Sequence, residues 1–385
     1  MPNILDYLDW RGDLEFNRDP INEVDNLVFS VLSYMDFAGA VPALDESGSV
    51  ALSDACETLK LMPDQVTAPI TSSFFSRLPL LLDKCAASAR YRGVRLSNYV
   101  NKVSFDEAEQ FSALVFSIDE NTHFVAFSGT DDTLIGWKED LEMSFREVVP
   151  AQRSAVEYLE LVMARLPGVF YLGGHSKGGN LAVFAAANIP ADLQPSILLV
   201  YNNDGPGFQR SIIESPGYQR VTDKIINFLP QSSVVGMLLN QSGHYQVVAS
   251  EESGIMQHNA LTWEVLGTSF VYKEGLSSSS VLFNNALRAW LDTVSNEERA
   301  EFIEALFTIL EATGARTLRE FTQDKLTNAK AMIATFKNLE PETQAHLKLL
   351  LETFFAEIQK VLRSSLTESI SSLITRTFAR KRLPS

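Results

Sequence analysis

The sequence lacks several features that would place it in a specialised class of protein. It has only two cysteines, Cys56 and Cys85, and neither lies in a CxxC pair, which argues against a disulfide framework or a zinc site. No stretch reaches the about 18 uncharged apolar residues that mark a membrane span. Positive charge is also scarce. With 32 Lys and Arg against 48 Asp and Glu, the net charge is −16, so we expect no nucleic acid as a main partner.

The N-terminus also lacks the pattern of a secretory signal. A signal peptide needs a basic start followed by an apolar run, whereas "MPNILDYLDWRGDLEF" carries Asp6, Asp9 and Asp13 there. We therefore expect a cytoplasmic protein. The 385 residues are too many for a minimal domain, and they suit one large domain with an appendage or two domains.

The apolar pattern of the first 275 residues alternates between strands and helices. It predicts helices over 21–37, 151–167 and 177–189, and strands over 112–130 (a pair joined by a turn), 168–174, 196–203, 224–229, 245–250 and 269–274. This alternation predicts parallel βαβ units, with a sheet that is covered on both faces. Residues 40–105 are mixed, and we expect them to cover a pocket.

The character of the chain changes after "GLSSSS" at 275–280. Helical periodicity runs through 281–380, with long segments at 283–294, 297–312, 317–338 and 342–364. We therefore predict a domain of residues 1–275 and a helical region of residues 276–385. The spacing in these helices is heptad-like in parts, so they could bind a partner or pair two copies of the chain. The basic tail, "RTFARKR", could touch an anionic membrane surface.

The stretch "GGHSKGGNL" at 173–181 matches the pattern G-x-S-x-G around Ser176. A serine hydroxyl is a poor nucleophile unless it is exposed to a base, and a sharp turn from a strand into a helix exposes it. Here a predicted buried strand precedes the serine and a small-residue helix start, "GGNLAVFAAA", follows it. We therefore predict that Ser176 is a nucleophile. The alternative is a glycine-rich turn with a solvent-exposed serine.

The base must be one of five histidines. His123 is predicted in a hairpin turn, His346 in the C-terminal helices, and His175 adjoins the serine with its side chain pointing away from that of Ser176. His244 and His258 remain. In hydrolases of this kind the histidine follows the last core strands, which favours His258 in "SGIMQHNALTW". His244 opens a strand, where it lines the pocket or has a structural role.

The acid that orients the histidine should follow a strand after the nucleophile helix. Asp204 does so in "LLVYNNDGPGF", at the edge of the sheet where sites of parallel sheets collect. Asp223 precedes its strand and is therefore at the wrong end. One strand later, "PQSSVVG" holds Ser232 and Ser233 but no carboxylate. The alternative for Asp204 is turn chemistry, because Asp before Gly is common in loops.

Two backbone amides can stabilise an oxyanion in such a site. One belongs to Lys177, the residue after the predicted nucleophile. The other belongs to Thr130, which follows an early strand in "FVAFSGTDDTLIGWKEDL". The alternative for Thr130 is a polar turn with no catalytic part.

With these residues assembled, the sequence resembles two related groups. "VAFSGTDDTLIGWKEDL" and "LGGHSKGGNLAVFAA" are similar to the "FRGT…W…D" block and the nucleophile turn of class 3 lipases, with Ser128 in place of arginine. "NILDYLDWRGDLEF", "GGHSKGGNLA", "NDGPGF" and "SGIMQHNALTWEV" resemble the bacterial Mbeg-like family over roughly residues 1–275. The resemblance implies an α/β-hydrolase fold, a serine-hydrolase site, and Thr130 and Lys177 as oxyanion residues. Class 3 lipases carry their acid in a "D-x-V-P" motif where this chain has Ser232 and Ser233, so the acid moves to Asp204 or is missing.

We therefore expect a serine hydrolase that cleaves a carboxylic ester or thioester, with a small-molecule acyl ester or lipid-like substrate. Ser176, His258 and Asp204 form the expected triad, His244, His175 and Ser128 are candidates for the pocket, and no cofactor or metal is needed. The alternative function is a non-catalytic scaffold that uses its C-terminal helices. Geometry discriminates between them, because the hydrolase needs a histidine within reach of Ser176.

Overall fold

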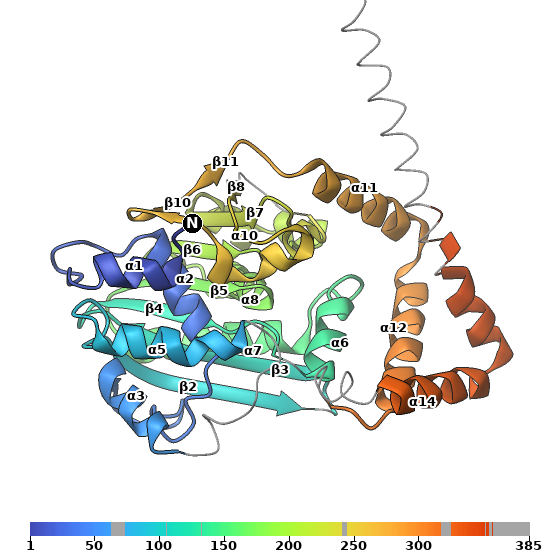
Figure 1. Cartoon of the computed structure of the whole chain (residues 1–385), viewed down its shortest axis with the longest axis horizontal. Coiled ribbons are helices and arrows are strands. Elements are labelled where there is room, and N and C mark those ends of the chain that lie inside the picture. The colour runs from blue at the N-terminus through green and yellow to red at the C-terminus, as the bar shows by residue number, and fades with distance from the viewer. Residues whose placement is uncertain are drawn as a thin grey trace, which may run out of the picture. The chain divides into compact units, whose positions relative to one another are not determined.

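The computed structural model describes residues 1–62, 74–104, 106–131, 133–240, 245–316, 325–350, 352–353 and 356. The chain forms two compact units. Met1–Leu276 and Ala315–Asp324 form the first, and Ser277–Gly314 and Lys325–Ser385 form the second. Each unit is drawn in Figure 1. The site that the sequence predicts lies in the first.

A large sheet forms the centre of the first unit. Within the described ranges it has nine strands, in the order β1-β2-β3-β4-β5-β6-β7-β8-β11. Strands β4 to β8 are parallel, whereas the strands on either side of them pair antiparallel. The strands are β1 Val50–Ala51, β2 Arg95–Ser104, β3 Glu109–Ser117, β4 Thr122–Phe127, β5 Val169–His175, β6 Ile197–Asn203, β7 Ile225–Pro230, β8 Tyr245–Val248 and β11 Tyr272–Lys273. Two further short strands, β9 Val265–Leu266 and β10 Ser269–Phe270, pair with each other.

Helices cover both faces of this sheet. The α-helices of the first unit are α1 Ile4–Arg11, α2 Glu23–Leu32, α3 Leu52–Lys60, α5 Leu78–Ala87, α6 Leu134–Glu142, α7 Pro150–Arg165, α8 Lys177–Asn188, α9 Arg210–Ile213 and α10 Pro216–Val221. One apolar core lies between the sheet and α1, α2, α3 and α5, and the other lies between the sheet and α7, α8 and α10. Figure 1 shows α1, α2 and α5 over the strands. This is the covered, mostly parallel sheet that the alternating pattern predicts, and the fold class is confirmed.

Local sequence explains why the two helices nearest the predicted site form where they do. Asn22 caps α2, because its side chain accepts hydrogen bonds from the amides of Val24 and Asp25. Helix α8 is rich in alanine and has two glycines in its first turn, so it packs closely against β5 and β6. The residues of α8 up to Ala187 are buried. Small side chains thus bring the start of α8 close to the ends of the neighbouring strands.

The region 40–105, which we predict to cover a pocket, contains the long strand β2 of the central sheet. The structure differs from the sequence predictions in two places. His123, predicted in a hairpin turn, lies in β4, opposite Ser117 of β3. Helix α6 was not predicted, because charged residues interrupt its apolar positions.

The second unit is helical within its described residues. It contains α11 Ser278–Thr293, α12 Asn296–Glu311 and α14 Lys325–Asn338, and residues 341–350 are also helical. Ala305, Ile309 and Leu347 form its small apolar core. Part of the predicted helix at 342–364 lies outside the described residues. Among the helices that the structure describes, none is long and apolar enough to cross a membrane.

Candidate active site

Ser176 lies at a sharp turn between β5 and α8. Its backbone has φ 57° and ψ −132°, a region that residues other than glycine rarely adopt. A Cβ atom at Gly178 would lie 2.1 Å from the carbonyl oxygen of Phe127, and one at Gly174 would lie 2.2 Å from the backbone of Gly178. The two glycines therefore allow the strand and the helix to approach, and the strained serine is what a nucleophile turn requires.

The side chain of His258 reaches the hydroxyl of Ser176. His258 ends the short 3₁₀ helix η5, Gly254–His258, and its Nε2 atom lies 3.0 Å from Ser176 Oγ. On the other side of the ring, Nδ1 lies 2.6 Å from Oδ2 of Asp204. A serine, a histidine and a carboxylate are thus joined in one hydrogen-bonded row, although the first two are 82 positions apart in the sequence. His244, the other candidate for the base, lies outside the described residues.

Asp204 is held in place from several directions. It follows β6 directly, has a φ of 53° and is fully buried. While Oδ2 faces His258, Oδ1 accepts hydrogen bonds from the hydroxyl of Ser233 at 2.5 Å and from the amide of Gly236 at 3.2 Å. These contacts fix the orientation of the carboxylate, which can hold an imidazole in one tautomer.

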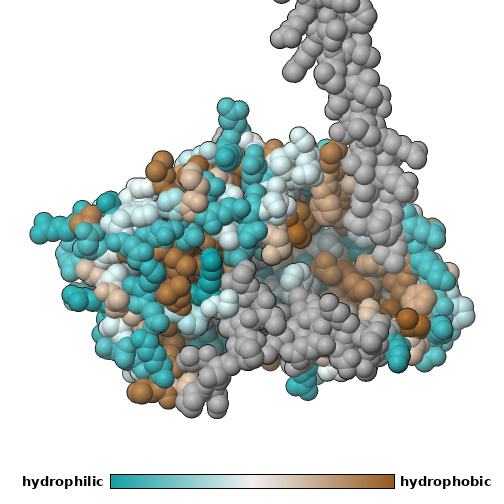
Figure 2. All heavy atoms as spheres, in the orientation of Figure 1, coloured by the Kyte–Doolittle hydropathy of each residue, from teal (hydrophilic) through white to brown (hydrophobic). Residues whose placement is uncertain are grey.

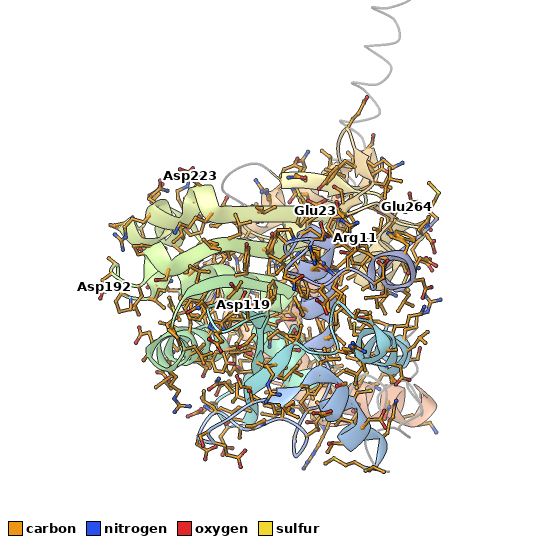
Figure 3. The ribbon with its side chains drawn as sticks, turned by 90° about the vertical axis from the view of Figure 1, so that its left-hand side faces the viewer. Arg11, Glu23, Asp119, Asp192, Asp223 and Glu264 are labelled. Carbon is orange, nitrogen blue, oxygen red and sulfur yellow. The ribbon has the colours of Figure 1, made fainter. Side chains whose placement is uncertain are left out.

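Asp223 and the segment after β7 are the other two locations where an acid could lie. Asp223 lies before β7, and Figure 3 shows it on the same side of the molecule as Asp192, which lies before β6. It is therefore at the edge where the parallel strands begin, away from Ser176. Ser233 follows β7, where class 3 lipases carry their acid, and here its hydroxyl donates to Asp204.

Thr130 follows β4, and its hydroxyl donates to Oδ2 of Asp140 on α6 at 2.5 Å. The amides of Thr130 and Lys177 have no hydrogen-bond acceptor within the described part of the chain. Burial raises the pKa of Asp140 to about 6, although the charge of Lys177 and the Thr130 hydroxyl act in the opposite direction. Ser128, where class 3 lipases have arginine, is buried and donates to the carbonyl of Gly129 at 3.3 Å.

The side chain of Lys177 extends into the interior of the protein. Its ammonium group is fully buried and lies 3.0 Å from Oε2 of Glu139, 2.8 Å from the carbonyl of Gln110 and 2.6 Å from the side-chain oxygen of Gln110. Glu139 in turn accepts hydrogen bonds from the amides of Gln110 and Ala151. A buried ion pair with its donors and acceptors satisfied thus ties α6 to the start of α8.

The ring of His175, a predicted pocket residue, is buried beside that of His258, with ring centroids 4.6 Å apart, and it hydrogen-bonds to Tyr34. Sequence reasoning missed Tyr34 and Asp140. The lipase-like block that contains Thr130 also includes Asp140 and could have indicated it, whereas no sequence signal links Tyr34 to this site.

The parallel sheet, the helices on both of its faces and the serine at the strand-to-helix turn define an α/β-hydrolase fold, with an additional helical region. The chain belongs to the Mbeg1-like family, whose model matches residues 85–308. A search of curated proteins found no match.

Several solved structures are similar to the chain at low identity. A mutant of MDLA from Penicillium cyclopium has a TM-score of 0.37 and 13% identity, over 64% of this chain and 82% of that one. The propeptide complex of Rhizomucor miehei lipase has a TM-score of 0.34 and 13% identity, over 64% and 81%. M37 lipase has a TM-score of 0.32 and 14% identity, over 56% and 68%.

Proposed function

We propose that this protein is a serine hydrolase that cleaves a carboxylic ester or thioester through an acyl-enzyme. The observation that carries the proposal is the row of Ser176, His258 and Asp204, with distances of 3.0 and 2.6 Å between the interacting atoms. A scaffold on the same fold has no need for a histidine within reach of the serine. The strained backbone of Ser176 supports the same proposal, since strain of this kind collects at functional sites.

The reaction begins when Ser176 Oγ attacks the carbonyl carbon of the substrate and its proton passes to His258 Nε2. Asp204 keeps the proton of His258 on Nδ1 and stabilises the imidazolium. The amides of Thr130 and Lys177 stabilise the oxyanion of the tetrahedral intermediate. When the carbon–oxygen or carbon–sulfur bond breaks, His258 donates its proton to the leaving group. A water molecule, deprotonated by His258, then releases the acid and restores Ser176.

An apolar acyl group is supported by the side chains that neighbour the site in sequence. Ile255 and Met256 precede His258 in η5 and are 62% and 55% exposed. On α6, which also carries Asp140, Trp137 and Leu141 are 46% and 40% exposed. Exposed apolar side chains on the two elements that carry site residues suit an acyl chain better than a polar substrate. We expect kcat/KM to rise with acyl length across a graded series of p-nitrophenyl esters.

The Ser176→Ala variant tests the nucleophile. We expect the wild type to cleave p-nitrophenyl esters and to be labelled by a fluorophosphonate probe, and the variant to do neither. Wild-type activity in Ser176→Ala, or no labelling of the wild type, would overturn the proposal.

Asp204 is tested by moving the carboxylate. Asp204→Asn should lower kcat by about 10⁴-fold, because the amide favours the wrong tautomer of His258. Adding Ser233→Asp to this variant places a carboxylate at the neighbouring position and should restore part of the lost kcat. If Asp204→Asn keeps the wild-type kcat, Asp204 is not the acid.

A further inference from the structure

The ring of His175 is bonded at both nitrogen atoms, and its partners decide which nitrogen carries the proton. Nε2 lies 2.8 Å from the backbone carbonyl oxygen of His258, which can only accept, so Nε2 carries the hydrogen. Burial lowers the pKa of His175 well below its ordinary value, and the ring is therefore neutral. Nδ1 must then accept a hydrogen bond, and the hydroxyl of Tyr34 lies 3.0 Å from it.

The hydroxyl of Tyr34 also contacts two backbone segments, the end of β5 before Ser176 and the loop before Thr130. It lies 3.1 Å from the carbonyl oxygen of His175, the residue before Ser176. A Cβ atom at Gly129 would lie 1.9 Å from this hydroxyl oxygen, so the loop before Thr130 runs directly against it. One phenol thus touches the strand end before Ser176, the loop before Thr130 and the histidine that supports His258.

Helix α2, which precedes Tyr34, also supports the acid. The side chains of Asn26 and Asn203 exchange hydrogen bonds of 2.9 and 3.1 Å, and Ser30 lies 3.2 Å from the same Asn203 amide. This amide also donates to the carbonyl of Gly174 at 2.9 Å. Asn203 immediately precedes Asp204. The segment from α2 to Tyr34 therefore contacts the surroundings of the serine, the histidine and the acid, although it lies outside the residues that the family model matches.

We propose that Tyr34 and His175 are positioning residues, which hold the loop of His258 in register with the turn of Ser176 and the loop of Thr130. The proposal rests on the proposed function. The ring of His175 packs against two other rings, with centroids 4.6 Å from His258 and 5.8 Å from Phe74. The Nε2–H group of His175 fixes the backbone of His258. Without the His175 ring, the imidazole of His258 can therefore move away from Ser176. Displacements of about 1 Å can lower catalysis by about a hundredfold.

His123 provides a matched control for substitutions of His175. It too is a buried histidine, with Nε2 2.9 Å from a backbone carbonyl, that of Pro167, and Nδ1 2.8 Å from a hydroxyl, that of Ser117. It lies at the start of β4, whereas Ser176 follows the end of the neighbouring parallel strand β5, so the two residues are at opposite ends of these strands. Substitution of either histidine by phenylalanine removes the same two hydrogen bonds from a buried ring, but only His175 supports the site.

The kinetic test compares His175→Phe, His175→Gln, Tyr34→Phe and His123→Phe. We expect His175→Phe to lower kcat and the rate of fluorophosphonate labelling by about ten- to a hundredfold, with KM changed less than about twofold. In His175→Gln the amide can still donate to the carbonyl of His258, so part of the rate should return. Tyr34→Phe should lower kcat by about tenfold, and His123→Phe should leave kcat unchanged. Wild-type kcat in both His175→Phe and Tyr34→Phe, or an equal loss in His123→Phe, would overturn the proposal.

A second test needs no activity. Imidazole ¹⁵N spectra of the full chain should show His175 as the neutral Nε2–H tautomer between about pH 6 and 8. The Nδ1–H signal of His258 should move in His175→Phe and Tyr34→Phe but not in His123→Phe. An Nδ1–H tautomer at His175, or an unmoved His258 signal, would overturn the positioning role. A wild type that the probe fails to label would overturn the hydrolase proposal instead, and the spectra would still decide this one.

Discussion

At the scale of single residues, burial changes the acidity of the carboxyl group of Asp140. Its Oδ2 atom accepts from Thr130, whereas Oδ1 is buried and has no hydrogen-bond partner among the described residues. Burial raises the pKa of this group from 3.8 to about 6. Between these values the folded protein keeps a proton that the unfolded chain has lost, so this group makes the folded state less stable as the pH rises from about 4 to about 6.

The Asp140→Asn variant should remove this pH dependence. The variant should gain stability relative to the wild type as the pH rises from 4 to 6, and above that the difference should stay constant, on the order of 2 to 3 kcal/mol. Urea unfolding of both proteins at a series of pH values measures this difference in the free energy of unfolding. Glu120→Gln, which changes an exposed carboxylate in the turn between β3 and β4, should show no such trend. A constant difference between pH 4 and 8 would contradict the raised pKa of Asp140.

At the scale of elements, the turn between β5 and α8 depends on the absence of a side chain at Gly178. A Cβ atom there would meet the backbone oxygen of Phe127 in β4, which cannot move without shifting the sheet. Gly178→Ala should therefore force α8 away from β4, with a loss of about 1 to 3 kcal/mol in the free energy of unfolding and a large loss of labelling at Ser176. Urea unfolding and fluorophosphonate labelling measure the two effects.

Gly93 offers the control for this substitution. It is exposed, and a Cβ atom there would have no neighbour within 4 Å. Gly93→Ala should leave both the free energy of unfolding and the labelling rate close to those of the wild type. Equal behaviour of the two alanine variants would show that the close approach of α8 and β4 is not required.

At the scale of the whole molecule, the net charge of −16 creates a negative field around the protein. Figure 2 shows hydrophilic residues spread over the first unit on the face that it presents. Such a field attracts cationic substrates and repels anionic ones, and salt screens it.

At about 10 mM salt, kcat/KM for a cationic ester should exceed that for an anionic ester of the same acyl chain by roughly tenfold. The ratio should fall towards one at about 0.5 M salt, while a neutral ester shows little change. A ratio that is independent of salt would contradict this prediction.

The sequence by itself determined the fold class, the family and the turn of Ser176. Each of these depends on local pattern, because buried parallel strands, small-residue helix starts and flanking glycines leave a signal within about ten residues. The choice of Asp204, His258, Thr130 and Lys177 for the site also came from chain order and short motifs. Their catalytic roles stay predictions, which the variants above test.

Only the tertiary structure decided which distant groups meet. The carboxylate of Asp204 contacts His258 and accepts a hydrogen bond from Ser233. Both contacts depend on the turn after β6, where Asp204 adopts a positive φ, and on the packing of two loops. The contact between Tyr34 and His175 joins residues that are 141 positions apart. No periodicity or motif encodes such a contact, since it arises from the packing of α2 against the end of β5. The sequence therefore indicated the chemistry, and the packing of distant segments determined the geometry.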